Sequence, residues 1–202
     1  MPEGNRISNP PLIAGTILGV RIWRTDMGLC SLRSSSTGAR WQTHGGATAA
    51  VCVRHDNRYH RVPGKECTCG LYAHHAYRFP PQILRRLHRP DPRTVVGFVE
   101  AWGRIELHLE GFRAEFARPV AFINFTWPKP KEDEDPRWYG TRKRRCAYEY
   151  RLIELAERCG AEVIDCNKGD KLGAWIHDDP RALRRETLAR LIPRRRRSPR
   201  RS

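Results

Sequence analysis

Three cysteines and two histidines lie within eighteen residues of this chain, and their side chains point to metal binding. The run starts at Cys52, passes His55 and His60, and closes with the CxC pair Cys67 and Cys69. Thiolate and imidazole are the ligands that suit tetrahedral zinc. The predicted zinc ligands are Cys52, His60, Cys67 and Cys69, with His55 as the alternative to His60.

The spacing of these ligands differs from that of the common zinc motifs. It is neither the paired CxxC of a zinc ribbon nor the spacing of a C2H2 finger. Pro63 and Gly64 suit a turn that brings the chain back between His60 and Cys67. The alternatives are reduced cysteines that pack like small apolar side chains and a disulfide or redox pair. Four candidate ligands favour a closed structural site, because a catalytic zinc keeps one position open.

Several segments around the cluster have the pattern of strands. The clearest block alternates between polar and apolar residues and predicts an antiparallel meander. The expected strands are 12–24, 48–54, 95–102, 104–109, 112–117, 119–125 and 161–165, and residues 33–47 are expected to form a loop. The expected helical segments are 71–77, 82–88, 146–159 and 181–192. The predicted fold class is α+β: a small, mostly antiparallel β-barrel or strongly curved sheet with peripheral helices and a zinc staple.

Changes in composition divide the chain into five expected parts. These are a disordered N-terminus (1–11), a zinc-stapled β-rich domain (12–127), a charged linker (128–141), a helix–strand–helix extension (142–192) and a disordered arginine-rich tail (193–202). The tail has no apolar residues to bury, which is typical of disorder.

A set of polar and aromatic side chains lies on two neighbouring predicted strands. Its members are Trp102, Arg104, Glu106, His108, Arg113 and Glu115. A turn at Glu110 and Gly111 would bring the two strands face to face, so that Glu106 or His108 opposes Arg113 or Glu115. One interpretation is a set of cross-strand charge pairs on a solvated face. The other is a face that recognises a ligand, or an acid and a base. Trp102 is expected in the core, with a platform for stacking as the alternative.

The positive charge is concentrated near the end of the chain. Residues 181–202 hold ten arginines and one acid, which gives +9 of the total net charge of +16. Arginine suits phosphate through its planar fork of donors, so nucleic acid is the expected partner. The alternatives are a solubilising tail and a codon bias toward arginine. The candidate contacts are Arg142, Lys143, Arg144, Arg145, Arg194, Arg195, Arg196, Arg197, Arg200 and Arg201.

The remaining sequence signals concern location and catalysis. The start of the chain lacks the basic and apolar regions of a signal peptide, and no apolar run approaches the roughly 20 residues that span a bilayer. We therefore expect a cytoplasmic protein that makes no membrane contact. The serine-hydrolase, metalloprotease, P-loop and zinc-deaminase motifs are absent, so an enzyme is the less favoured interpretation.

Four segments resemble a set of uncharacterised bacterial proteins. They are CxCGLYA (67–73), VVGFVEAWGRIELH (95–108), GFRAEFA (111–117) and ELAERCGAEVI (154–164). Those proteins carry a C…H…CxCG-YA segment followed by a V-G-V-WG-H-G-RAE-A segment. The resemblance covers about residues 15–165. It implies an architecture but no function, and it favours His60 over His55 because the matching histidine precedes the proline.

Three functions fit these patterns. The first is a zinc-stabilised nucleic-acid-binding module, whose basic C-terminal segments contact phosphates while the barrel face recognises a ligand or nucleotide. The second is a zinc-dependent enzyme that acts on nucleotides or nucleic acid, with Glu106 or His108 as the general base. The third is a phage- or assembly-associated interaction protein with a basic tail.

Overall fold

The structure is a computed structural model of the whole chain. It describes residues 15–26, 29, 31–35, 38–52, 60–64, 67–81, 83–84, 91, 93–124, 142–166 and 171–191. Within these ranges, no helix is both long enough and apolar enough to span a membrane.

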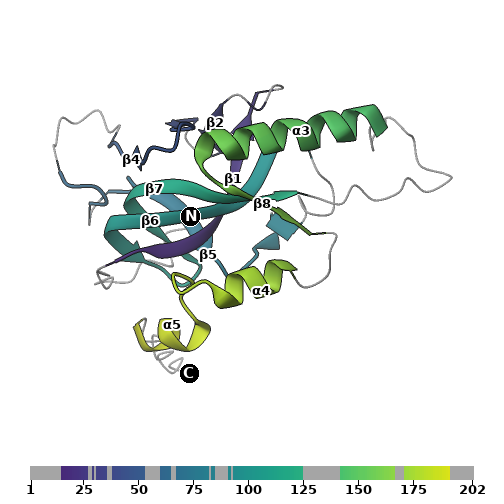
Figure 1. The fold of residues 1–202 in the computed structure, drawn as a ribbon. Coiled ribbons are helices and arrows are strands. Elements are labelled where there is room, and N and C mark those ends of the chain that lie inside the picture. The colour runs from purple at the N-terminus through teal and green to yellow at the C-terminus, as the bar shows by residue number, and fades with distance from the viewer. Residues whose placement is uncertain are drawn as a thin grey trace, which may run out of the picture.

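One eight-stranded sheet forms the centre of the molecule (Figure 1). Its strands are β1 (Ile17–Thr25), β2 (Leu32–Ser34), β3 (Arg40–Trp41), β4 (Thr48–Ala49), β5 (Leu71–His75), β6 (Thr94–Leu107), β7 (Gly111–Asn124) and β8 (Glu162–Asp165). Strands β1 and β7 each pair with both β5 and β6, so these four strands form a closed ring of pairings. All pairs are antiparallel except β7 with β8. The predicted mixed α+β class with a mostly antiparallel sheet is confirmed, and the barrel or strongly curved form stays a prediction.

The longest strands, β6 and β7, form a hairpin, and each is continuous where the sequence predicted a break. Gly103 was expected to end a strand, but it lies in a bulge of β6, with φ +78° and a register shift between Trp102 and Ile105. Pro119 lies inside β7 at a second register shift, which tolerates its missing N–H. Bulges of this kind bend a strand without ending it, and so the expected meander is a single long hairpin.

Residues 71–77 do not form the expected helical turns, because Leu71–His75 is strand β5. This segment has a hydrogen-bonded neighbour on each side, with Gly19 opposite His75 in β1 and Leu71 opposite Ala114 in β7. Pairing with two strands outweighs the weak local preference for a helix. The expected loop 33–47 likewise contains strand β3 and the end of β2, and only two residues of the expected strand 48–54 are in β4.

Helix α3 (Arg142–Cys159) begins earlier than predicted and ends as predicted at Gly160. Gly160 has φ +62°, and its N–H donates to the Glu157 carbonyl while the Ala161 N–H donates to the Ala156 carbonyl. These two bonds form a Schellman cap. The chain then enters β8, which pairs with β7, so segment 142–192 contributes a strand to the same sheet as the β-rich region.

The expected helix over 181–192 is shorter and follows a helix that the sequence did not predict. The structure has α4 (Lys171–Asp178) and α5 (Arg185–Leu191). Between them, the Arg181 side chain pairs with Asp179 and Glu100, and its carbonyl accepts a hydrogen bond from Leu18. These contacts hold residue 181 against β1, and the helix starts only afterwards. Most of the helix expected over 82–88 lies outside the described residues.

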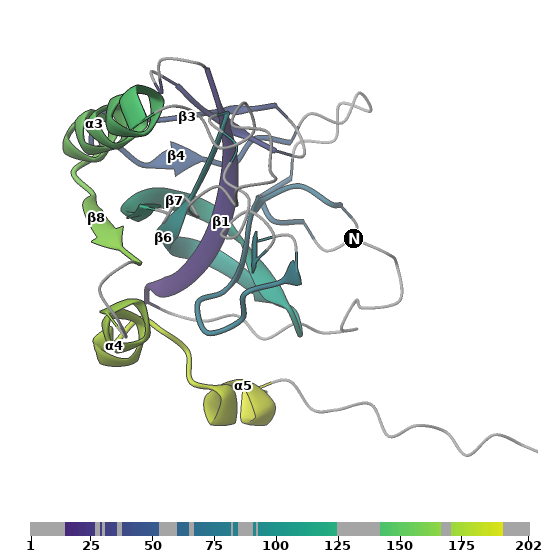
Figure 2. The same cartoon turned by 90° about the vertical axis from the view of Figure 1, so that its right-hand side faces the viewer.

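Two apolar clusters cover the two faces of the sheet. The first includes Trp23 and Phe112 and is covered by α3 through residues such as Leu152. The second includes Phe98 and is covered by α4 through Trp175, whose ring lies 4.7 Å from that of Phe98. Figures 1 and 2 show α3 and α4 on opposite sides of the sheet. We call these the α3 face and the α4 face.

Candidate metal centre

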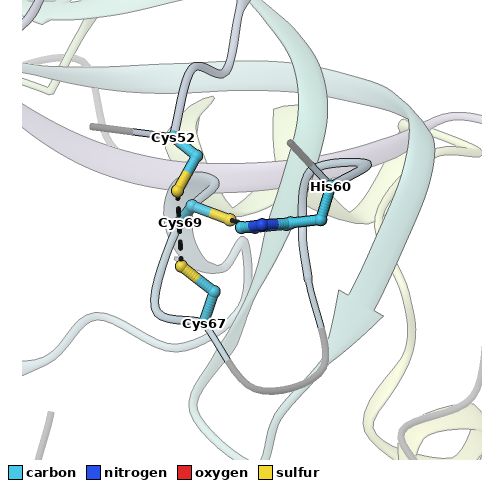
Figure 3. Close-up of side chains that lie close together, drawn as sticks. All are labelled: Cys52, His60, Cys67 and Cys69. Atoms are coloured by element: carbon cyan, nitrogen blue, oxygen red, sulfur yellow. Dashed lines mark hydrogen bonds between the residues drawn. The ribbon is translucent and has the colours of Figure 1, made fainter. Parts of the chain in front are cut away.

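Four side chains from three places in the chain meet beside the β6–β7 hairpin (Figure 3). Cys52 follows β4, His60 begins a described loop, and Cys67 and Cys69 come just before β5. Their ligand atoms all lie within 4.8 Å of one another, close enough to hold one metal ion. This is the predicted ligand set. The alternative ligand, His55, lies outside the described residues.

One of two donor–donor distances matches a tetrahedral ion, and the other, between His60 and Cys69, is shorter than such an ion would give. Cys52 Sγ lies 3.5 Å from Cys67 Sγ, and His60 Nε2 lies 3.1 Å from Cys69 Sγ. Metal–ligand bonds of roughly 2.0–2.3 Å at tetrahedral angles place such donors roughly 3.5–3.8 Å apart. The Gly64 N–H donates to Cys69 Sγ over 3.5 Å, and a Cβ at Gly64 would lie 2.4 Å from the His60 ring. The turn predicted at Pro63 and Gly64 therefore requires a glycine.

The thiols of the cluster differ in acidity. Although burial opposes ionisation, hydrogen bonds from the Cys69 backbone and from the Cys52 and Cys69 thiols lower the pKa of Cys67 to about 7. Burial raises the pKa of Cys69 to about 11. At neutral pH the cluster therefore supplies one thiolate readily, and a bound cation would favour the loss of further protons.

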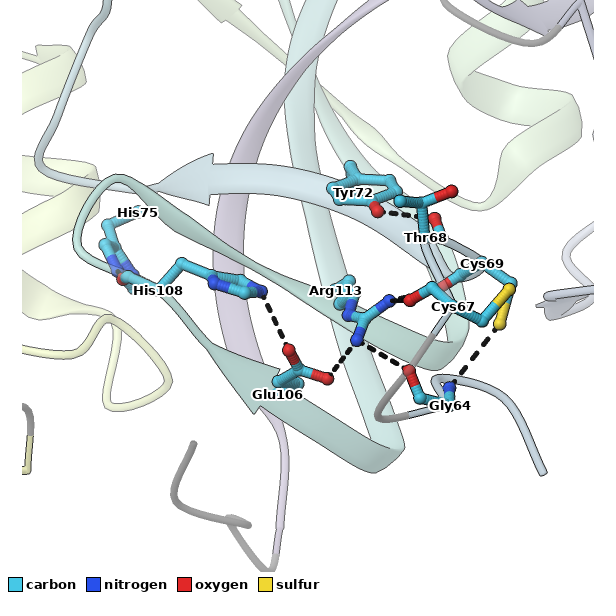
Figure 4. Close-up of polar contacts among 9 residues, drawn as sticks. All are labelled: Gly64, Cys67, Thr68, Cys69, Tyr72, His75, Glu106, His108 and Arg113. Carbon is cyan, nitrogen blue, oxygen red and sulfur yellow. Dashed lines mark hydrogen bonds and ion pairs between the residues drawn. The ribbon is translucent and has the colours of Figure 1, made fainter. Parts of the chain in front are cut away.

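Arg113 fixes the loop that carries the cysteines (Figure 4). Its guanidinium donates to the carbonyl oxygens of Gly64 (2.8 Å), Cys67 and Cys69 (3.1 Å). The side chain is 4% exposed, so these bonds are shielded from water. Gly70, with φ +132°, lets the backbone pass against the Arg113 side chain. Arg113 therefore orients the CxC segment without being a ligand itself.

Glu106 holds Arg113 from the other side. It lies opposite Arg113 in the β6–β7 register, which is one of the pairings that the sequence left open, and its Oε2 accepts from the guanidinium. Its Oε1 lies 3.3 Å from His108 Nε2. Although burial alone would raise the pKa of Glu106, the hydrogen bonds from His108 and Arg113 place it below its usual value. The carboxylate therefore uses both oxygens inside this network.

The rest of the predicted polar face lies elsewhere on the hairpin. Trp102 is half-buried and stacks on Phe116, with ring centroids 6.2 Å apart. Glu115 Oε2 accepts from the Arg104 backbone N–H at 3.1 Å, across the bulge at Gly103. A ligand-recognising role for Trp102, Arg104 and Glu115 stays a prediction. The sequence pointed to Arg113 but gave no sign that it contacts the cysteine loop.

A buried histidine lies at the far end of this network. His75 Nε2 donates to the His108 carbonyl at 2.8 Å, which leaves Nδ1 as the unprotonated nitrogen. In the described part of the chain, Nδ1 has no hydrogen-bond partner. Protonation would place an N–H there without an acceptor. Burial accordingly lowers the pKa of His75 to about 4, and it also lowers the pKa of His74.

Acid should weaken the fold because His75 has to stay neutral. An unfolded histidine titrates near pH 6.5, so the unfolded chain binds more protons than the folded chain between about pH 6.5 and 4. Stability therefore falls as the pH is lowered through this window, by about 2 kcal/mol from pH 6.5 to 5 for this group. Urea unfolding at both pH values measures the decline.

The matched variants separate His75 from other titrating groups. In His75→Gln, the loss of stability between pH 6.5 and 5 should be smaller by about 2 kcal/mol. His44→Gln, at an exposed position, should lose as much stability as the wild type. Equal pH dependence in the two variants would contradict the assignment.

The basic residues predicted to contact nucleic acid lie mostly outside the described residues. The backbone of residues 142–145 forms the first turn of α3, but their side chains are not described. Residues 194–201 lie beyond the last described residue. No family model matches this sequence, and no curated protein or solved structure was found to be similar to it. The resemblance noted from the sequence therefore rests on its motifs alone.

Proposed function

We propose that this chain is a nucleic-acid-binding module stabilised by a structural zinc ion. Three sulfur donors and one imidazole are a ligand set that favours zinc over the harder cations. When bound, the ion would cross-link the segment after β4, the loop at His60 and the segment before β5. The metal would thus stabilise the fold, and binding would take place elsewhere on the surface.

The surroundings of the cluster favour a structural role over a catalytic one. Four donors converge, which leaves no open position in a tetrahedral site. Glu106 has both oxygens engaged, and Arg113 lies between it and the cysteine loop. A general base needs a free basic atom within reach of the proton that it takes. The zinc-enzyme alternative with Glu106 as the base therefore gains no support from this geometry, and Nε2 of His108 is held by the same carboxylate.

A row of arginines on three neighbouring strands is the observation that best supports a polyanionic partner. Arg24 in β1 lies opposite Arg33 in β2, and Arg33 lies opposite Arg40 in β3. All three are exposed, and none forms an ion pair with a described residue. Like charges that face each other across strands are destabilising, and a phosphate backbone would relieve that repulsion. We call these three residues the arginine row.

The segments predicted from the sequence would add further positive charge for such a partner. The sequence places four cations in the first turn of α3, an end of a helix that favours acidic residues. Their placement is explained if they serve a partner. Together with the tail at 194–201, they would supply phosphate contacts, which give affinity without selecting a sequence.

The salt dependence of binding tests this proposal. The intact chain should bind labelled DNA or RNA oligonucleotides at low salt in a fluorescence-anisotropy titration. Replacing Arg24, Arg33 and Arg40 by Gln should flatten the slope of log K against log salt by roughly 2 to 3 on duplex DNA, because each lost phosphate contact removes about 0.9. Replacing the four arginines at 194–197 by Gln should flatten it by roughly 3 to 4.

A matched control removes three positive charges from other parts of the surface. Arg78, Arg118 and Arg151 are exposed, and Arg78 and Arg118 pair with Glu110 and Glu100. Replacing these three by Gln should change the slope by less than about 1. The proposal fails if the intact chain shows no binding at low salt, or if the control flattens the slope as much as the loss of the arginine row.

A further inference from the structure

Arg21 is a cation inside the apolar core, and no described residue gives it a negative partner. The alternation of β1 places it on the α3 face, between Gly19 and Trp23, and only 7% of its surface is exposed. No described carboxylate forms an ion pair with it. Burial lowers the pKa of Arg21 to about 10, and no neighbouring charge offsets that effect.

The groups that hold Arg21 are all neutral. One guanidinium nitrogen donates to the Tyr72 carbonyl, and another donates to Ser34 Oγ at 2.7 Å. The Cζ atom lies 4.7 Å from the centroid of the Trp41 ring. These contacts orient the guanidinium but do not neutralise it, and a buried charge without a counterion is strongly disfavoured.

Three buried donors without a partner belong to Arg21 and to two tryptophans beside it. Arg21 Nε, Trp23 Nε1 and Trp41 Nε1 are buried, and none has a partner in the described part of the chain. The two indole rings lie edge to face, with centroids 5.5 Å apart. One positive charge and three N–H groups without a described partner therefore lie close together in the apolar core, an environment that disfavours such groups. The complement of such a set is a negatively charged acceptor.

We propose that Arg21, Trp23 and Trp41 form a binding site for an oxyanion, the phosphate or carboxylate group of a small ligand. The guanidinium still has N–H groups to offer, and its planar fork matches both kinds of group. Ser34 and the Tyr72 carbonyl position the guanidinium, and the Trp41 ring supports its flat face. The site lies on the α3 face of the sheet, opposite to the arginine row on β1, and does not depend on nucleic-acid binding.

The test is calorimetric titration of the full chain with inorganic phosphate and, separately, with acetate, at a constant ionic strength set by sodium chloride. We expect saturable binding of one anion per chain, and the anion that binds more tightly identifies the ligand group. Arg21→Met should weaken that affinity at least tenfold. Trp41→Phe keeps a ring under the guanidinium but removes an N–H, and it should weaken the affinity severalfold with little change in melting temperature.

The arginine tail needs its own control because it also attracts phosphate. Replacing Arg194–Arg197 by Gln should leave the affinity of the site unchanged. The proposal is overturned if the wild type shows no saturable binding, or if binding survives Arg21→Met and disappears with the tail. It is also overturned if Trp41→Phe folds normally and binds as tightly as the wild type. If Arg21→Met does not fold, the Trp41→Phe result decides. Nucleic-acid binding should persist in both core variants, so the two proposals can fail separately.

Discussion

Replacing any one of the four ligands should abolish stoichiometric zinc binding and unfold much of the β-sheet. The cluster ties the approach to β5 to the end of β4, and β5 lies between β1 and β7 in the ring of strand pairings. Structural zinc sites supply about 10–16 kcal/mol in small domains, whereas whole domains are stable by only about 5–15 kcal/mol. We therefore expect Cys67→Ser to lose about 5 kcal/mol or more of unfolding free energy. Zinc content and thermal unfolding measure the two effects.

Two controls accompany these variants. Cys146→Ser changes an exposed thiol on α3 and should keep both the zinc and the melting temperature. His55→Asn should also keep the zinc, whereas His60→Asn should lose it; the reverse result would identify His55 as the ligand. If any one of the four ligand variants keeps its full zinc content, the site is not closed and the account is contradicted.

Removing Arg113 should be the most damaging single change outside the ligands. The variant Arg113→Gln would free three carbonyl oxygens of the cysteine loop and leave Glu106 buried without its cation. Breaking a buried pair on one side costs about 3–5 kcal/mol. Because the loop would lose its orientation, zinc affinity should also fall by roughly 10- to 100-fold. Denaturant unfolding and a competitive zinc titration measure these effects.

Arg118 provides the matched comparison. It also pairs with a glutamate on the neighbouring strand, Glu100, but its side chain is 48% exposed. Arg118→Gln should therefore cost only about 0–1 kcal/mol and leave zinc affinity unchanged. Arg113→Lys should behave more like Arg113→Gln than like the wild type, because one ammonium group cannot replace the planar fork. Equal costs at positions 113 and 118 would refute the role assigned to Arg113.

The grouping of the four candidate ligands could be predicted from the sequence because their chemistry is local. Cysteine and histidine are few in number, and a turn at Pro63 and Gly64 is enough to explain how His60 and the CxC pair meet. The end of α3 was predictable for the same reason, since the left-handed conformation at Gly160 depends on its immediate neighbours.

Strand β5 and the long hairpin were predicted wrongly because their structure depends on distant partners. Residues 71–77 have no strong pattern of their own and become a strand by pairing on both sides. Gly103 and Pro119 look like strand ends in the sequence, but each lies at a shift in register within a continuous strand. Whether a glycine ends a strand or bends it is decided by the strand opposite.

The contacts of the two buried arginines, Arg21 and Arg113, could not be predicted from the sequence either. Arg113 lies in an alternating strand, so the face of the strand that it occupies was predictable. The cysteine loop that covers this face comes from more than forty residues earlier in the chain. The signal for Arg21 was its place two residues before Trp23, on the same side of the strand. That pattern would have placed the cation in the core, although its neutral partners, Ser34 and Tyr72, could not have been inferred.

The closed four-ligand zinc centre is best tested by zinc-edge X-ray absorption spectroscopy of the purified full chain. We expect one zinc per chain with three sulfur atoms at roughly 2.3 Å and one nitrogen at roughly 2.0–2.1 Å. An oxygen atom in place of one of these ligands would indicate an open site and would contradict the structural role. A chain that folds without any bound metal would contradict it as well.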